Sequence, residues 1–155
     1  MLRRTHIMLF LASLCCFSAC TSDAVYQAQK TIPAEGWHYK NDIVFEEFIP
    51  DSLSLYDIFV DIRNTTDYTY SNFFLFLEID LPDGRSLRDT LELILADRRG
   101  QWTGRGFGYI RTNRFLYRQD VRFPAEGSYR FTLRQGMRDD LLTGISDVGI
   151  SIQKK

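Results

Sequence analysis

Hydrophobic and polar positions alternate residue by residue through much of the chain. Side chains two residues apart lie on the same face of a β-strand, so this alternation is typical of strands with one buried and one solvated face. The pattern therefore predicts half-buried strands in five segments: 53–64, 72–81, 86–96, 127–136 and 147–153.

Turn-forming residues separate these segments and favour an all-β fold. Pro82-Asp83-Gly84 predicts a tight turn between two of the runs. Only residues 137–142 could form a short helical turn. We expect a single antiparallel β-sandwich of about seven or eight strands, immunoglobulin-like or jelly-roll-like, with the strand order left open. Glycine and proline recur between the expected strands at 33–36, 100–108, 124–127 and 143–149.

The first twenty residues have the anatomy of a secretion signal. A positive head at 3–6 precedes the uncharged residues 7–19, which as a helix would span about 20 Å, too short for a hydrocarbon core of about 30 Å. Residues 17–20, Phe-Ser-Ala-Cys, place small residues before Cys20. This segment resembles a bacterial lipobox, with Phe17 where leucine is usual.

Cleavage before Cys20 would divide the chain into three parts. Residues 1–19 would form a lipoprotein signal peptide, 20–32 a lipidated N-terminus and tether, and 33–155 the β-sandwich domain. The remaining cysteines lie within the signal, so the mature chain would carry no free thiol, as suits an oxidising compartment. The alternative is plain secretion with Cys20 as an ordinary residue. Because Thr and Ser rather than Asp follow Cys20, we favour the outer membrane, facing the periplasm.

Catalytic and metal-binding patterns are sparse. His38 is the only histidine after the signal, which excludes a multi-histidine or cysteine zinc site and makes any Ser-His-Asp triad depend on it. The glycine-rich segment 104–108 precedes no helical pattern, so a phosphate loop is not expected. Asp80, Asp83 and Asp97 lack calcium-loop spacing. We expect no metal, no cofactor and no enzymatic activity; a carboxylate pair for glycoside hydrolysis is the third hypothesis.

Charge is divided unevenly along the chain. Residues 20–97 hold five basic and fifteen acidic residues, whereas residues 98–138 hold ten arginines and two acidic residues. The structural interpretation pairs these arginines across strands with Asp57, Asp61, Glu78 or Glu92. The functional interpretation is a surface for anions, including Arg105, Arg130 and Arg134, because guanidinium groups suit carboxylate and phosphate. Nucleic acid is not expected outside the cytoplasm.

Aromatic residues in turn-like segments are a second candidate surface. Tyr68, Tyr70, Trp102, Phe107 and Tyr109 could form sugar platforms or protein contacts, or could cover the ends of the sandwich. Separately, Ser52 and Thr90 each follow aspartate and precede leucine, which resembles a short O-glycosylation acceptor pattern of some gliding bacteria.

Longer segments, from Cys20 nearly to the C-terminus, contain several specific motifs. These are Arg63-Asn64, Asp67-Tyr68, Tyr70-Ser71-Asn72, Gly104–Gly108 and Gln135-Gly136-Met137-Arg138. Together they resemble the gliding motility lipoprotein GldH family. Thr69 stands where the family is expected to have proline. The resemblance implies a membrane-anchored periplasmic lipoprotein linked to motility and secretion machinery, and it carries over no catalytic residues.

Two functional hypotheses from different classes remain open. The first is a non-enzymatic docking or scaffold lipoprotein, held in the membrane by lipid on Cys20 and bound to envelope machinery. The second is a glycan- or peptidoglycan-binding module that uses loop aromatics and the arginine surface.

Overall fold

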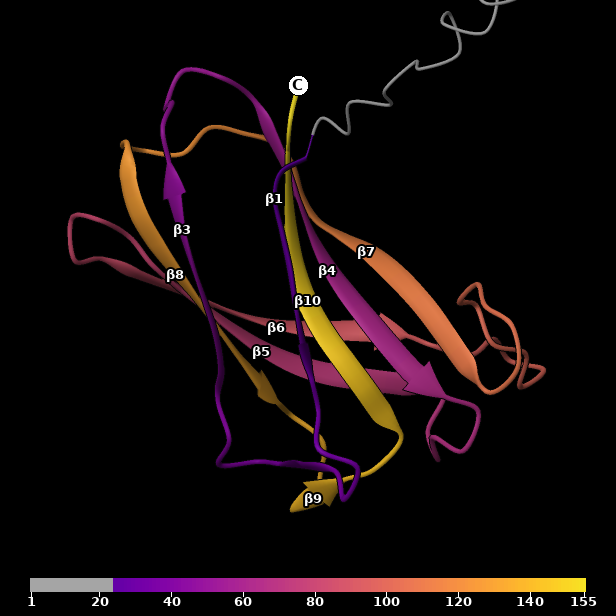
Figure 1. Cartoon of the computed structure of the whole chain (residues 1–155). Coiled ribbons are helices and arrows are strands. Elements are labelled where there is room, and N and C mark those ends of the chain that lie inside the picture. Colours follow the sequence, from indigo (N-terminus) through magenta and orange to yellow (C-terminus); the bar gives the residue numbers. More distant parts are fainter. Residues whose placement is uncertain (1–23) are drawn as a thin grey trace, which may run out of the picture.

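The computed structural model describes residues 24–155, which form two four-stranded antiparallel sheets that face each other and a short third sheet (Figure 1). Sheet I has the strand order β1-β10-β4-β7, sheet II has the order β3-β8-β5-β6, and β2 pairs with β9. The strands are β1 (Ala24–Thr31), β2 (Trp37–His38), β3 (Ile43–Ile49), β4 (Tyr56–Thr65), β5 (Asn72–Asp80), β6 (Ser86–Ile94), β7 (Ile110–Val121), β8 (Gly127–Gln135), β9 (Leu141–Leu142) and β10 (Ile145–Lys154).

The strand order is that of a jelly roll. Along the chain, the eight long strands alternate between the two sheets, except that β5 and β6 are neighbours within sheet II. An immunoglobulin-like sandwich would instead keep more hairpin-connected neighbours in one sheet. The structure thus confirms the β-sandwich and selects the jelly-roll alternative.

The core lies between the two sheets and follows the alternation of the sequence. In β5, Phe73, Leu75, Leu77 and Ile79 are buried, and the intervening residues face outward. The five predicted strands are confirmed as β4, β5, β6, β8 and β10, with ends shifted by a few residues. The core also contains these residues of the other strands: Tyr56, Ile58, Val60, Ile62, Tyr129, Phe131, Leu133, Val148, Ile150 and Ile152.

The structure differs from the expected tether at residues 20–32. Residues 24–31 form β1, which pairs with β10 at the edge of sheet I, and Ile32 donates a backbone hydrogen bond of 2.8 Å to Ser146. Only two residues of β1, the half-buried Tyr26 and Ala28, pack against the core, so its sequence shows only a weak apolar pattern. The expected signal peptide and Cys20 lie outside the described residues.

Residues 137–142, which could have formed a short helical turn, do not form one. The buried Gln135 side chain donates to the Asp139 carbonyl at 2.7 Å and accepts from the Met137 amide at 2.8 Å. These bonds take the place of helical backbone bonds, and Leu141 and Leu142 then pair with β2.

No helix in the described part of the chain is long and apolar enough to cross a membrane.

Candidate functional site

The connection between β6 and β7, residues 95–109, is named here the β6–β7 loop, and its first half is a turn ordered by Asp97. The Asp97 carboxylate accepts hydrogen bonds from the backbone amides of Arg99 at 2.8 Å and Gln101 at 2.9 Å. The Asp97 amide donates to the Gln101 carbonyl at 2.8 Å. The turn therefore uses the acidic side chain internally and leaves Arg98 and Arg99 exposed.

The second half of the loop is a small hairpin with a glycine-dependent tip, residues 106–109. Arg105 and Thr112 exchange backbone hydrogen bonds of 2.9 and 2.7 Å. A Cβ atom at Gly106 would lie 2.2 Å from the Ile110 carbonyl oxygen, and Gly108 has a φ of +67°. The first position has no room for a side chain and the second needs a positive φ, and glycine meets each requirement at low cost. The two glycines therefore help to define the conformation of this tip.

A buried polar network fixes the base of the loop to the sandwich. Asn113 of β7 donates to the Asn64 side chain at 3.0 Å and accepts from the Thr103 hydroxyl at 3.2 Å. Gly104 lies against Asn113 so closely that a Cβ atom there would come within 2.7 Å of its amide. The Thr66 amide also donates to the Tyr109 carbonyl at 2.8 Å. Hydrogen bonds and close packing therefore tie the base of the loop to β7 and to the end of β4.

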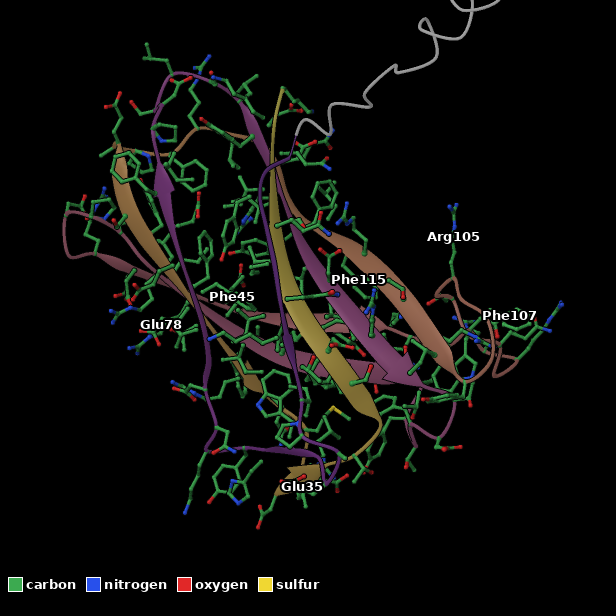
Figure 2. All side chains as sticks on the ribbon, in the orientation of Figure 1. Glu35, Phe45, Glu78, Arg105, Phe107 and Phe115 are labelled. Carbon is green, nitrogen blue, oxygen red and sulfur yellow. The ribbon has the colours of Figure 1, made fainter. Side chains whose placement is uncertain are left out.

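The tip presents aromatic rings to solvent. Phe107 is 100% exposed and Tyr109 is 67% exposed, and Figure 2 shows Phe107 and Arg105 projecting away from the sheets. A single exposed apolar residue is ordinary on a protein surface. A completely exposed ring on a hydrogen-bonded hairpin is different, because it can bind a partner with little loss of loop entropy.

The arginine excess divides into two groups. Arg114, Arg118, Arg130 and Arg134 each lie within 2.9 Å of a carboxylate. In contrast, the other six arginines of residues 98–138 have no carboxylate within 4.0 Å among the described residues. Arg98, Arg99 and Arg105 lie in the β6–β7 loop, and Arg111 directly follows it and donates to the Gly108 and Ile110 carbonyls at 2.7 and 2.9 Å. The remaining two are Arg122 and Arg138. Four of the six unpaired arginines thus belong to the β6–β7 loop or adjoin it.

The other predicted aromatic residues cover one end of the core. Tyr68 is only 4% exposed, its hydroxyl donates to the Asn72 carbonyl at 3.0 Å, and burial raises its pKa. Tyr70 packs edge-on against Tyr68 and donates to Asp139 at 2.8 Å. Trp102 is partly buried against the core. Among the predicted aromatics, only Phe107 and Tyr109 are available as a binding surface together with Arg105.

Arg130 and Arg134 lie on the outer face of sheet II, away from the loop. Arg130 pairs with Glu46 at 2.7 Å, and Arg134 forms two hydrogen bonds of 2.6 Å with Asp42. The bonds from Arg134 hold the pKa of the Asp42 carboxyl below its ordinary value. The candidate residues therefore belong to two separate surfaces.

Sequence reasoning missed two exposed phenylalanines on this outer face. Phe74 is 37% and Phe76 is 45% exposed, on the side of β5 opposite to its buried residues. Phe76 and Arg134 line a shallow hollow between β6 and β8, together with Thr90. The signal available in the sequence was that aromatic residues occupy solvent-facing positions of the alternating segment 72–81.

The two candidate glycosylation residues lie on the surface of different elements. Thr90 is exposed on β6, and Ser52 lies in the bend between β3 and β4.

The outer face of sheet I contains a buried ion pair that confirms part of the structural interpretation of the arginines. Asp61 is 4% exposed and accepts hydrogen bonds of 2.7 and 3.1 Å from Arg114. The Ser151 hydroxyl also donates to Asp61 and accepts from Arg114 at 3.1 Å. Other predicted carboxylates have different partners: Asp57 pairs with Lys155, Glu78 with Arg88, and Glu92 accepts from Asn72.

We expect Arg114→Met to lower the free energy of unfolding by about 2–3 kcal/mol, because it leaves the buried Asp61 carboxylate with Ser151 alone. Arg88→Met is a matched control, because the Arg88 side chain is 78% exposed, and its loss should cost about 0–1 kcal/mol. Urea unfolding of both variants measures the difference. Equal effects would contradict a structural role for the Asp61–Arg114 pair.

The described residues offer little catalytic geometry. The His38 Nδ1 atom accepts from the Lys40 amide at 3.2 Å, and its ring stacks on Tyr39. Within residues 24–155, no group of three or more histidine, cysteine, aspartate or glutamate side chains is placed to hold a metal ion. A strand, β7, follows the glycine-rich segment, so the glycines serve the hairpin described above.

Comparison with known proteins identifies close relatives. A family model described as GldH lipoprotein matches residues 24–152. A protein of Christiangramia forsetii, "Gliding motility lipoprotein GldH homolog", is 36% identical over 96% of this chain and 94% of its own length. "Gliding motility lipoprotein GldH" of Flavobacterium johnsoniae is 32% identical over 96% and 95%.

Similarity to solved structures is low. The infectious bursal disease virus VP2 subviral particle matches 83% of this chain and 30% of its own, at 15% identity and a TM-score of 0.35. A similarity at this level carries no argument about function.

Proposed function

The chain belongs to the GldH lipoprotein family, and from that premise we propose that it is a non-enzymatic docking component of the cell envelope. Lipid on Cys20 would hold it in the outer membrane, facing the periplasm. The β6–β7 loop would bind a protein partner in the motility or secretion machinery. The observation that carries this proposal is the completely exposed Phe107 on an ordered hairpin that also carries Arg105 and Arg111.

The position of the loop relative to the N-terminus supports this arrangement. Ala24 pairs with Gln153 of β10, and Gln153 pairs in turn with Asp57 near the start of β4. The loop precedes Ile110, which pairs with Thr65 at the other end of β4. The ten residues of β4 span about 33 Å at about 3.3 Å per residue. In Figure 1, β1 begins beside the C-terminus, and the loop between β6 and β7 lies at the far end of the sheets.

This geometry would present the loop away from the membrane. The chain from Cys20 to Ala24 can extend over at most about 14 Å, so the end of the sandwich that contains Ala24 would stay near the bilayer. The tip would then face the periplasm rather than the lipid. An aromatic ring beside arginines is a common centre of protein interfaces, and the positive charge favours an acidic partner.

A pulldown from detergent-solubilised membranes tests the proposal. We expect the wild-type protein to capture a reproducible partner at low salt, and the yield to fall steeply above about 0.15 M ionic strength, where exposed charges are screened. Arg98→Gln combined with Arg105→Gln should reduce both the yield and its dependence on salt. Capture that is indifferent to salt and to these arginines would contradict the proposed contact.

A second candidate function, glycan or peptidoglycan binding, rests on the outer face of sheet II. There, the exposed Phe76 ring lies in a hollow beside Arg134 and Thr90, and aromatic rings can stack on sugars. O-glycosylation of Thr90 would place a sugar in the same hollow, so modification and binding there would compete. A native mass equal to that of the lipidated chain alone would exclude glycosylation at both Ser52 and Thr90.

Retention on purified cell wall distinguishes the two functions. If sheet II binds glycan, we expect Phe76→Ala to abolish retention while Phe107→Ala leaves it unchanged. Phe76 is half exposed on the outer face, so its loss should leave the core intact. Absence of wild-type retention would contradict the glycan hypothesis.

A further inference from the structure

The sandwich is open along one side, between β6 and β7. These strands are the edges of sheet II and sheet I, and they do not pair with each other. Inner-face residues near this opening line a cavity of about 280 Å³. The opening is separate from the β6–β7 loop, because the cavity lies toward the end of β7 at Val121, whereas the loop precedes Ile110.

The floor of the cavity is apolar. Ile58, Ile79, Leu81 and Phe123 line it, and each is less than 9% exposed. Tyr129 also contributes, and its hydroxyl donates to the Ala125 carbonyl at 2.8 Å. The floor thus offers carbon surface and no unsatisfied polar group. A sugar or nucleotide would lose its hydrogen bonds to water there without replacing them.

Leu87 keeps the mouth of the cavity apolar. It occupies an inner-face position of β6 opposite Ile79, yet it is 55% exposed. Its exposure follows from the open edge, since β7 does not pair with β6 to cover it. Leu87 therefore extends the apolar lining of the cavity to its mouth, and binding sites for small molecules are lined mainly by apolar side chains.

Charged groups surround the mouth on the side of β7. Arg118 lies 2.9 Å from Asp89, which also accepts from the Tyr117 hydroxyl at 3.3 Å. Arg122 donates to the Leu53 carbonyl at 3.1 Å and has no carboxylate within 4.0 Å among the residues of the described range. The guanidinium of Arg88 pairs with Glu78 instead. The mouth therefore carries two guanidinium groups for one carboxylate and favours an anion.

We propose that this cavity binds a medium-chain fatty acid, with its acyl chain on the apolar floor and its carboxylate at Arg122 beside Arg118. The volume limits the ligand to a small one, such as a single unbranched chain, because small-molecule pockets usually measure about 300–1,000 Å³ and this cavity, at about 280 Å³, lies just below that range. The position of the cavity also suits a fatty acid. Val121 of its lining pairs with Tyr56 at the same end of the sandwich as Ala24, the end that the proposed lipid on Cys20 would keep near the bilayer. The inference does not depend on docking by the β6–β7 loop.

Photocrosslinking with a diazirine derivative of decanoic acid tests the site in membranes that contain the full-length protein. We expect crosslinks to the peptides that contain Leu87 and residues 117–124. Excess decanoate should suppress them, whereas decyltrimethylammonium, with the same chain and a positive head, should not. Suppression by both amphiphiles, or no crosslink at all, would overturn the proposal.

Matched variants separate the cavity from nonspecific labelling by lipid. Leu87→Glu should abolish the crosslink, and Leu87→Trp should do so by filling the mouth without adding charge. Leu116→Glu is the control, because Leu116 is a similarly exposed leucine on the edge strand β7. Leu116 pairs with Phe59 on the outer face of sheet I, so it points away from the cavity. Arg122→Gln should weaken labelling about two- to fivefold, the range of an exposed ionic contact. Equal labelling of the Leu87 and Leu116 variants would refute the site.

Discussion

Replacing Phe107 with alanine is expected to weaken binding of the protein partner about thirtyfold. Burial of an aromatic ring at the centre of an interface is worth about 2 kcal/mol or more, which corresponds to that factor in the dissociation constant. Because Phe107 is 100% exposed and makes no contribution to the core, its loss should leave the free energy of unfolding within about 0.5 kcal/mol of the wild type. Biosensor titration with the captured partner and a thermal melt measure the two quantities.

The control for this experiment is Leu53→Ala. Leu53 is 82% exposed in the connection between β3 and β4, at the end of the molecule opposite the β6–β7 loop. The Leu53→Ala substitution removes exposed apolar surface and leaves the tip unchanged, so binding should remain at the wild-type level. If Phe107→Ala binds as tightly as Leu53→Ala, the tip is not the docking surface.

The second large effect is expected from Cys20→Ala, which should abolish incorporation of palmitate. Without acyl chains, the chain would lose its proposed attachment to the membrane. Two or more chains anchor a protein stably, at about 0.8 kcal/mol per buried CH₂. Metabolic labelling with palmitate, followed by detergent phase partitioning, measures the change.

Cys16→Ala provides the matched comparison for lipidation. Cys16 would leave with the signal peptide, so its replacement should preserve both labelling and membrane partitioning. A wild-type protein that incorporates no palmitate, or one that is found free in the medium, would contradict the anchor at Cys20. It would also remove the argument that the β6–β7 loop is held away from the bilayer.

Glycine positions show how local chemistry made part of the loop predictable. Residues 104–108 contain three glycines and precede no helical pattern, which correctly indicates turns rather than a phosphate loop. The reason for each glycine is tertiary: Gly106 lies against the Ile110 carbonyl, and Gly104 lies against Asn113 of β7. The sequence therefore indicates a turn, but it does not show that the turn presents Phe107 on a fixed support.

Alternation of apolar and polar residues is a local property, and it is what the sequence by itself determined. It specified five strands, the face of each that points inward and the β-sandwich, because side-chain direction in a strand repeats every two residues. The motifs between Cys20 and the C-terminus likewise identified the GldH family to which the chain belongs. Alternation did not locate β1, β3 and β7, which lie at sheet edges. In β1, only the half-buried Tyr26 and Ala28 pack against the core, so its apolar pattern is weak.

Only the tertiary structure decided which charges balance and which surfaces exist. Arg134 meets Asp42 across 92 positions of sequence, and Arg114 meets Asp61 across 53, so neither pairing could be read without the strand order. The same order separates Arg130 and Arg134 from Arg105 and buries Tyr68. It also leaves β6 and β7 as open edges around an apolar cavity. Contacts between distant segments depend on which strands become neighbours, and alternation along one strand contains no information about that choice.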